Sequence, residues 1–549
     1  MKLKGIFLLY FLIIFSASAQ KRTSNNTGLP RPKLVVGLMV DQMRWDFIYR
    51  YYDRYQQNGF KRLLNEGFSC DNTNIDYTTT VTGIGHSTVY TGSVPALHGI
   101  AGNDFILQAT GKTMYCTEDD SVEPVGSTSV AGKMSPRNLL AGTITDELKL
   151  ATNFRSKVIG IALKDRGSIL PAGHTANAAY WFDDASANWI TSTWYLKELP
   201  AWVQQFNAQK LAEKYLQQNW NTLYPLNTYV QSTPDNNRYE GAFKGAAGPV
   251  FPVNTAEIYR TSGVGIIRST PYGNTFTLDL AKAALEHEQL GQSGVTDFLA
   301  VSLSSPDYIG HQFGPNAVEI EDTYLRLDKD LADFFTALDK KLGKGNYTVF
   351  LTADHGASHN PNFLIDKKLP GGSWPSGTIL KDLNNFLETK YKVKNIALSF
   401  SNYQISLNNL TIGTNKLDES AIRKDCVQFM EKQTGVAYAV DIKEAQMASI
   451  PDALRQRMIN AYNPERSGVI QLFLKPGWFS GSANGTGTSH GTWSPQDSHI
   501  PLIWMGWGIK PGKTARPVNM SDITPTLAAL LRIQVPGGSI GQPILEVLK

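Results

Sequence analysis

The sequence predicts an α/β fold, in which a mostly parallel sheet is covered by helices on both faces. Three observations support this prediction: short uninterrupted apolar runs, helical patterns between them, and polar residues directly after the runs. A strand that is buried on both faces is apolar at every position, unlike the alternating strand of a half-exposed sheet. The chain of 549 residues exceeds one ordinary domain, so one large elaborated domain or two to three smaller ones are expected.

The N-terminus has the pattern of a secretory signal peptide over residues 1–19. Lys2 and Lys4 precede the apolar run Ile6–Phe15, and Ala17–Ala19 fits the small-x-small cleavage pattern. We expect cleavage near Ala19 and Gln20, and a periplasmic or secreted mature protein. The apolar run is too short for a spanning helix, so no stable membrane anchor is expected.

The predicted elements follow in chain order. Buried strands are expected at Lys33–Val40, Lys157–Leu163, Asp297–Leu303, Tyr347–Ala353 and Pro501–Met505. Tyr324–Leu338 carries one apolar stripe and is predicted to be a helix that stops by Gly343. Thr524–Leu531 is predicted as another helix, with Pro525 near its first turn. Alternating strands and helices of this kind are typical of a parallel sheet.

Two regions interrupt the alternation within a catalytic domain expected over residues 30–549. Residues at about 175–270 and 370–485 are expected to form insertions, as a cap or walls over the core. The first region is polar and holds five tryptophans: Trp181, Trp189, Trp194, Trp202 and Trp220. We favour ordinary packing over substrate stacking for these rings.

Charge and cysteine content exclude several classes of protein. The net charge is only +4 and no run is rich in lysine or arginine, so no nucleic-acid partner is expected. The three cysteines, Cys70, Cys116 and Cys426, allow at most one disulfide and exclude a cysteine-rich zinc site. Whether Cys70 and Cys116 pair is open from the sequence.

Polar side chains follow four of the predicted strands at the point where each strand ends. Asp41 follows the first strand, and Lys164-Asp165-Arg166 follows the second. Asp307 and His311 follow the third, and Asp354-His355 follows the fourth. A single aspartate after a strand is usually a turn residue or a helix cap. Because ligands bind beyond the carboxyl ends of the strands in open α/β sheets, the combination predicts a site at this edge.

The residue types at this edge indicate a metal centre. Asp307 and His311 are four residues apart, which places both on one face of a helical turn. Carboxylate and imidazole ligands suit zinc. Three aspartates and two histidines exceed the needs of one zinc ion, whereas two ions about 4 Å apart are the usual clamp for displacement at phosphorus. A complete pair of zinc sites would need one more histidine.

Seven motifs together resemble the alkaline phosphatase superfamily, and within it the PafA-type zinc-dependent alkaline phosphatases of the bacterial periplasm. The resemblance runs from about Pro30 to the C-terminus. Its motifs are VDQMRWD, TVTGIGH, GIAGND, LKDRGSILPAGH, DYIGHQFGP, ADHG and GTSHGTW. It implies an alkaline-phosphatase-like core and hydrolysis of small phosphate monoesters to an alcohol and inorganic phosphate.

The resemblance also implies the ligands and the nucleophile. One zinc site would be formed by Asp307, His311 and His490, and a second by Asp41, Asp354, His355 and the oxygen of Thr82. Thr82 is the implied nucleophile, which forms a phosphothreonine, while Thr78, Thr79 and Thr80 shape the approach. Gly83 and Gly85 are expected to let the backbone approach a phosphate closely.

Asn103, Lys164 and Arg166 are implied to bind the phosphoryl group. Lys164 and Arg166 are expected to alternate on an extended segment, so that their side chains share a direction. Without the resemblance, a turn asparagine and a solvated strand end would be the preferred interpretations. Lys164 takes the place of the third metal in magnesium-containing relatives, so no Mg²⁺ requirement is expected.

A charge count favours monoesters. Two zinc ions balance three aspartates and a threonine alkoxide, and Lys164 and Arg166 then match a phosphate dianion, whereas a diester carries one charge. Two alternatives stay open: a phosphodiesterase or nucleotide pyrophosphatase on the same core, and a zinc-binding envelope protein without catalysis. We expect a monomer. Among the other histidines, structural roles are expected for His86, His98, His174 and His287, and roles beside the ligands are open for His359 and His499.

Overall fold

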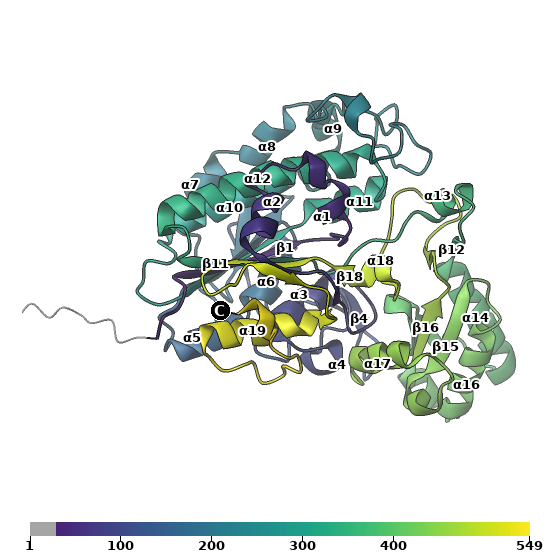
Figure 1. Ribbon diagram of the computed structural model, residues 1–549. Helices are drawn as coiled ribbons and strands as arrows, with labels where there is room; N and C mark the ends of the chain where they lie inside the picture. Colours follow the sequence, from purple (N-terminus) through teal and green to yellow (C-terminus); the bar gives the residue numbers. More distant parts are fainter. Residues whose placement is uncertain (1–28, 549) are drawn as a thin grey trace, which may run out of the picture.

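A ten-stranded mixed sheet forms the centre of the molecule in the computed structural model, which describes residues 29–548 (Figure 1). The predicted signal peptide lies outside the described residues. The strands, in spatial order, are β20 (Gly512–Thr514), β2 (Phe68–Cys70), β19 (Leu502–Gly506), β11 (Tyr347–Thr352), β1 (Leu34–Val40), β10 (Asp297–Leu303), β7 (Val158–Ala162), β8 (Ala178–Asp183), β9 (Asn188–Ser192) and β6 (Pro124–Val125).

The centre of the sheet is parallel, and an antiparallel pair joins it to the strands of each flank. Strands β11, β1, β10, β7 and β8 run in one direction, and Leu34 of β1 pairs with Asp297 of β10 and Tyr347 of β11. The α/β prediction is therefore confirmed. The run predicted at Pro501–Met505 does form a strand, β19, but it is antiparallel to β11. An apolar run specifies burial and carries no information on strand direction.

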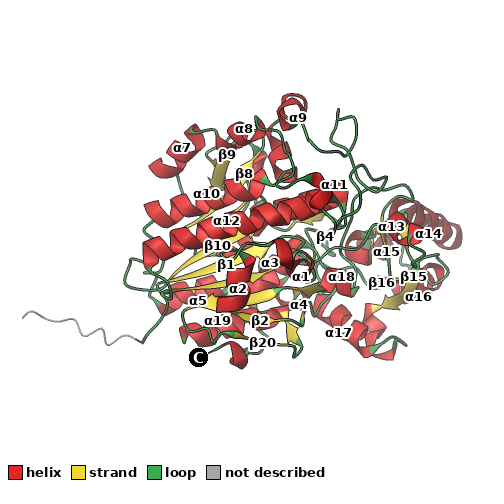
Figure 2. Cartoon of the chain, turned by 45° about the horizontal axis from the view of Figure 1, so that its top comes forward, coloured by secondary structure: helices red, strands yellow, loops and turns green. Residues whose placement is uncertain are grey.

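Helices cover both faces of this sheet, as Figures 1 and 2 show. The layer above it in Figure 1 contains α7 (Ala201–Ala208), α8 (Leu211–Leu216), α10 (Tyr272–His287) and α12 (Val318–Leu342). The layer below it contains α3 (Thr82–Thr91), α5 (Ile144–Ala151), α6 (Asp165–Ala172) and α19 (Ile523–Leu531). The predicted helix Tyr324–Leu338 lies within α12, which ends at Gly343, where φ is +86° and a Cβ atom would be strained.

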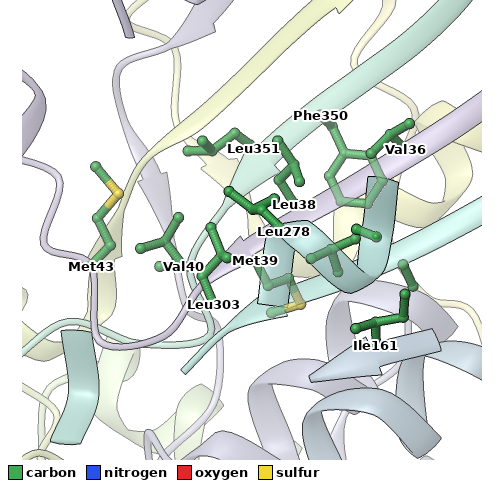
Figure 3. Close-up of a cluster of buried hydrophobic side chains, with 14 of the residues drawn as sticks. Val36, Leu38, Met39, Val40, Met43, Ile161, Leu278, Leu303, Phe350 and Leu351 are labelled. Carbon is green, nitrogen blue, oxygen red and sulfur yellow. The ribbon is translucent and has the colours of Figure 1, made fainter. Parts of the chain in front are cut away.

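The main core lies between the parallel strands and these helices. Figure 3 shows Val36, Leu38, Phe350 and Ile161 of neighbouring strands packed near Leu278 of α10. These side chains are at most 1% exposed, which explains why the strand sequences are apolar throughout. A rigid core of this kind fixes the positions of the residues that follow each strand.

A second, smaller sheet lies beside the main one, in green at the right of Figure 1. Its strands are β13 (Ala397–Ser399), β14 (Gln404–Leu407), β16 (Ile470–Leu474) and β15 (Val436–Asp441). Helices α14 (Ser376–Tyr391) and α16 (Glu419–Met430) pack on it and share a hydrophobic core of their own, with Leu383, Ile405 and Ile422.

The tryptophan-rich region contributes both to the main sheet and to its cover. Residues 178–192 supply β8 and β9 before the chain continues into α7, α8 and α9 (Thr255–Ser262). Trp181, Trp189 and Trp220 are at most 1% exposed, so these three rings pack in the interior. All three cysteines are buried and unpaired as thiols. Over residues 29–548, no helix combines the length and apolarity that crossing a bilayer requires.

Candidate active site

The carboxyl ends of the parallel strands bring the predicted polar residues together. Asp41 directly follows β1, and Asp354-His355 lie directly beyond β11. Asp307 and His311 lie on α11 (Ser305–Phe313), the helix that follows β10. Asp41, Asp354 and His355 are fully buried, and Asp307 is nearly so. These three strand ends therefore form one site, because the parallel strands all end at the same edge.

A first ligand set consists of Asp41, Asp354 and His355. His355 Nε2 lies 3.7 Å from Asp41 Oδ1 and 3.5 Å from Asp354 Oδ2. Within residues 29–548, none of these three buried atoms has a hydrogen-bond partner. His355 Nδ1 lies 2.9 Å from the carbonyl oxygen of Gly356 and donates to it, so the Nε2 lone pair faces the carboxylates. Three buried acceptors that face one another without a donor fit a bound metal cation.

A second set consists of Asp307, His311 and His490. Asp307 Oδ1 lies 3.1 Å from His311 Nε2 and 3.6 Å from His490 Nε2. Each Nδ1 atom lies against a backbone carbonyl oxygen, at 2.9 Å for Thr488 and 2.7 Å for Thr80. Both rings therefore keep Nε2 for the carboxylate, as a metal-binding histidine does. Burial alone would lower the pKa of His311, but the charge of Asp307 outweighs burial and raises it.

The two sets adjoin each other. The rings of His355 and His490 stack with their centroids 3.6 Å apart. Ligand atoms of Asp307, His355 and His490 also lie within 4.8 Å of one another, so His355 borders both sets. His490 comes from the loop after β17 (Trp478–Ser480), far along the chain from the other ligands. The fold thus brings a third histidine next to the candidate ligands Asp307 and His355.

Burial and neighbouring charges shape the protonation of these groups. Burial raises the pKa of Asp41, and the charge of Asp354 raises it further. Burial lowers the pKa of His355 and of His490, so both imidazoles are neutral at physiological pH. Neutral imidazoles beside buried carboxylates are a donor set that suits zinc.

Lys164 links the two ligand sets. Its Nζ atom lies 2.6 Å from Asp41 Oδ2 and 2.6 Å from Asp307 Oδ2. Burial alone would lower the pKa of Lys164, but the charges of Asp307 and Asp41 outweigh it and hold the pKa above its usual value. The ammonium group is therefore charged, at the boundary between the two sets.

The expected extended segment at Lys164 and Arg166 is wrong. Strand β7 ends at Ala162, Lys164 caps α6, and Arg166 lies in the first turn of that helix. The Arg166 Nη1 group donates to the hydroxyl of Tyr115 at 2.8 Å, and that hydroxyl donates to Asp165 Oδ1 at 2.6 Å. Tyr115 and Asp165 therefore orient the guanidinium group.

Thr82 is the first residue of α3, where backbone amides are free of helical partners. The backbone amide of Gly83 donates to Asn103 Oδ1 at 2.7 Å. The side-chain NH₂ group of Asn103 is not used in this hydrogen bond. The expectation for Gly85 is wrong: a Cβ atom there would lie 2.4 Å from the carbonyl oxygen of Asp354. Gly85 thus allows α3 to approach the end of β11, and its close neighbour is protein backbone.

Sequence reasoning missed Gln42. Its Nε2 group donates to Asp307 Oδ1 at 2.6 Å, and its backbone amide donates to Asp354 Oδ1 at 3.2 Å. One residue thus contacts both ligand sets. The available signal in the sequence was its position directly after Asp41, in the motif VDQMRWD. In the structure, Gln42 has a φ of +63°, which places it in a turn.

Three of the other six histidines differ in their distance from the site. His86 was expected to be structural, yet its ring lies 2.9 Å from the Thr82 carbonyl oxygen and 3.4 Å from Asp354 Oδ2. It therefore contacts both the candidate nucleophile and a candidate ligand. His359 instead bonds with Arg44 and Asn316, and His499 bonds with the backbone of Asp71.

Substituting Gln42 with asparagine is expected to weaken metal binding about 10- to 100-fold, as loss of outer-shell partners does in other metal sites. Asparagine tolerates a positive φ, but its shorter side chain loses the contact with Asp307. Competition between the protein and a chromogenic chelator for zinc measures the effect. Gln404→Asn is the matched control, since Gln404 bonds with Gln471 in the small sheet. Equal zinc affinity of Gln42→Asn and wild type would refute this role.

The sheet gathers buried aspartates and histidines at its strand ends, so the molecule is an α/β protein with candidate metal-ligand groups at that edge. The family model described as type I phosphodiesterase / nucleotide pyrophosphatase matches residues 35–496. The chain belongs to this family, which is part of the alkaline phosphatase superfamily.

Curated relatives match the chain over nearly its whole length. A protein of Myroides odoratus named calcium-transporting ATPase is 59% identical over 95% of both chains. Alkaline phosphatase PhoV of Synechococcus elongatus is 52% identical over 100% of both. Alkaline phosphatase PafA of Elizabethkingia meningoseptica is 48% identical over 98% of both.

Solved structures agree with these matches. A crystal structure of wild-type PafA superimposes with a TM-score of 0.93 at 50% identity, and covers 95% of this chain and 100% of its own. A PafA variant, in which one threonine is serine and an asparagine, a lysine and an arginine are alanine, superimposes with a TM-score of 0.92 at 49% identity, with the same coverage. A murine ectonucleotide pyrophosphatase/phosphodiesterase, with a TM-score of 0.52 at 13% identity, shares the fold.

Proposed function

We propose that the protein hydrolyses phosphate monoesters through a phosphothreonine at Thr82, with two zinc ions held by the two ligand sets. The observation that carries the proposal is the convergence of buried acceptor atoms of Asp41, Asp354 and His355 without a donor, next to the set of Asp307, His311 and His490. When bound, zinc would supply Lewis-acid chemistry and lower the pKa of coordinated oxygen groups.

The chain's own residues provide two displacement steps. In the first, the Thr82 oxygen forms a bond to phosphorus while the ester oxygen leaves with the bonding electron pair. In the second, water forms the bond to phosphorus and the Thr82 oxygen leaves, which releases inorganic phosphate. The start of α3 favours this chemistry because the N-terminus of a helix attracts an anion, and Thr82 is the first residue of that helix.

Asn103, Lys164 and Arg166 are proposed to bind the phosphoryl oxygens. The Asn103 oxygen accepts from Gly83, so its two amide hydrogens are left for an acceptor. Tyr115 holds Arg166, whose Nε group is buried and has no partner in the described chain. The PafA variant supports this set, since its substituted residue types recur here in the same order, as Thr82, Asn103, Lys164 and Arg166.

Charge favours a monoester over a diester. Lys164 and Arg166 add two positive charges beside a metal cluster that three aspartates and an ionised Thr82 would neutralise. A phosphate monoester dianion matches these two charges, and a diester matches one. No Mg²⁺ is required in this proposal, because Lys164 occupies the boundary between the ligand sets.

The names of the relatives favour a phosphatase over a transporter. PhoV and PafA are both named alkaline phosphatases, whereas one relative is named a calcium-transporting ATPase. If this chain hydrolyses ATP as one phosphorylated substrate among several, added Ca²⁺ should leave the rate of ATP hydrolysis unchanged. We further propose that the protein acts as a monomer, in the periplasm or outside the cell.

Lys164→Ala is expected to lower kcat/KM for an aryl phosphate monoester about 10²-fold or more, because one charged contact to the transferred group is lost. The rate with the matching methyl diester should change much less. Steady-state assays of the zinc-loaded wild type and variant with both substrates measure the two ratios.

Arg268→Ala serves as the matched control, since Arg268 is a cation that binds Asp184 and the Leu163 carbonyl. It should leave the ratio of monoester to diester rates unchanged. A wild type that prefers the diester, or a Lys164→Ala variant with an unchanged ratio, would support the phosphodiesterase alternative instead.

A further inference from the structure

A turn of the small sheet reaches the segment that carries Asn103. The turn is η5 (Ser401–Tyr403), which connects β13 to β14. It contacts β4 (Asp104–Ile106), which lies on the side of the main body nearest the small sheet (Figure 1). Asn402 has a φ of +59° and Tyr403 a φ of +53°. Asparagine tolerates this conformation but tyrosine rarely adopts it, so the contacts of the turn hold it there.

The half-buried Asn402 side chain lies against the backbone on both sides of Asn103. Its Nδ2 group donates to the carbonyl oxygen of Asp104 at 3.0 Å. On the other side, a Cβ atom at Gly102 would collide with the same nitrogen atom. The absence of a side chain at Gly102 therefore allows this close approach. One amide group of the turn thus contacts the residues directly before and directly after Asn103.

Two donors of the main body complete the support of Asn103. The backbone amide of Cys116 donates to the Asn103 carbonyl oxygen at 2.8 Å. The Gly83 amide donates to the side-chain oxygen, Oδ1. Because a side-chain amide is planar, fixing its backbone and its oxygen also fixes the direction of its two N–H bonds. Asn402 holds the peptide groups on either side of this residue, so it helps to set that direction.

Asn402 also contacts the segment that leads to the candidate nucleophile. The Thr79 hydroxyl donates to the Asn402 carbonyl oxygen. Thr79 lies three residues before Thr82 in the chain. The side chain of Asn402 therefore contacts the segment of Asn103, and its carbonyl group contacts the segment of Thr82. No other residue of the turn bonds with both segments in the described part of the chain.

The small sheet fixes the position of the turn. The Tyr403 hydroxyl accepts from the backbone amide of Ser480 at 3.0 Å. The Tyr403 carbonyl oxygen accepts from Gln471 Nε2 at 3.1 Å, and Gln471 lies on β16. The next strand, β14, carries Ile405 into the core of the small sheet. The turn is therefore rigidly attached to the small sheet, and its contacts transmit that position to the main body.

We propose that Asn402 is a positioning residue, which keeps the NH₂ group of Asn103 aimed at the transferred phosphoryl group. The inference rests on the proposed function, in which Asn103 binds a phosphoryl oxygen. A donor stabilises the transition state only when it is held at hydrogen-bonding distance from the developing charge. The small sheet, expected from the sequence to form a cap or wall, is in this proposal a supporting part of the active site.

Asn402→Gly is expected to lower kcat/KM for an aryl phosphate monoester about 10-fold, because Asn103 stays in place but loses its alignment. Glycine tolerates a positive φ, so the variant removes the side chain without straining the turn. The inhibition constant of inorganic phosphate should rise as well, while the zinc content stays that of wild type. Asn395→Gly is the matched control, because Asn395 is exposed, lies in the same insertion and has a φ of +56°. It should leave both constants unchanged.

A double-mutant cycle distinguishes positioning from a general loss of structure. Asn103→Ala alone should lower kcat/KM about 10²-fold, as loss of one transition-state donor does. In that background, Asn402→Gly should cost less than about 2-fold, because no amide group is left to align. The same loss in both backgrounds, or no loss in the wild-type background, would overturn the inference. An unchanged rate of Asn103→Ala would instead overturn the role of Asn103 in the proposed function, and the inference with it.

Discussion

Thr82→Ala is expected to lower kcat/KM for an aryl phosphate monoester by at least about 10³-fold, because the variant has no oxygen to receive the phosphoryl group. Thr82 lies at the start of α3, and its carbonyl oxygen contacts the His86 ring, which lies 3.4 Å from Asp354 Oδ2 of the first ligand set. Its substitution also removes the proposed covalent intermediate. Acid quenching during turnover, followed by mass spectrometry of the peptide with residue 82, should detect phosphate in wild type and none in the variant.

Two variants separate chemistry from folding. Thr82→Ser keeps a hydroxyl and should retain both the phosphorylated peptide and a large part of the activity. Thr91→Ala, at the other end of α3, removes a buried hydroxyl that bonds with the Ser87 carbonyl. It should leave the rate per folded molecule unchanged. Wild-type activity in Thr82→Ala would exclude Thr82 as the nucleophile and return the non-catalytic alternative to consideration.

The parts of the fold that the sequence predicts are those with a local physical signature. Asp297–Leu303 is predicted residue for residue as β10, because a strand covered on both faces must be apolar throughout. The strand at Leu502–Gly506 is also predicted, but its antiparallel direction is not. Direction depends on which neighbour the strand meets in the folded molecule. The same limit applies to β8 and β9, whose polar surroundings resemble an insertion while their strands extend the main sheet.

The site shows the same division between local and tertiary information. Asp41 and Asp354 directly follow apolar strands, so local sequence alone places them at the sheet edge. His490 lies in a loop far along the chain, and only the family resemblance identifies it. Gln42 and His86 escape prediction because their contacts with Asp307 and Asp354 arise from long-range packing. No periodicity or spacing in the sequence encodes such contacts.

Asp354→Asn is expected to abolish metal binding by the first ligand set and to lower kcat/KM by about 10³-fold or more. Asp354 Oδ1 is already occupied, since it accepts from the backbone amides of Gln42 and His355. Oδ2 faces His355 Nε2 at 3.5 Å without a donor of its own. Asparagine keeps the shape and the first oxygen, but replaces the charged ligand atom by an amide group that cannot bind a cation. Loss of Lewis-acid stabilisation worth several kcal/mol corresponds to a rate loss of this size.

Metal analysis distinguishes this effect from a general loss of stability. Elemental analysis should find one zinc ion fewer per chain in Asp354→Asn than in wild type. Asp330→Asn changes a partly buried carboxylate of α12 that bonds with Thr275, and should keep the full zinc content and activity. Treatment with a chelator should inactivate wild type, and added zinc should restore it, because the ligands come from rigid strand ends that persist without the ion. An Asp354→Asn variant with wild-type zinc content would mean that the buried acceptors of Asp41, Asp354 and His355 do not form a metal site, and the phosphatase proposal would lose its main structural support.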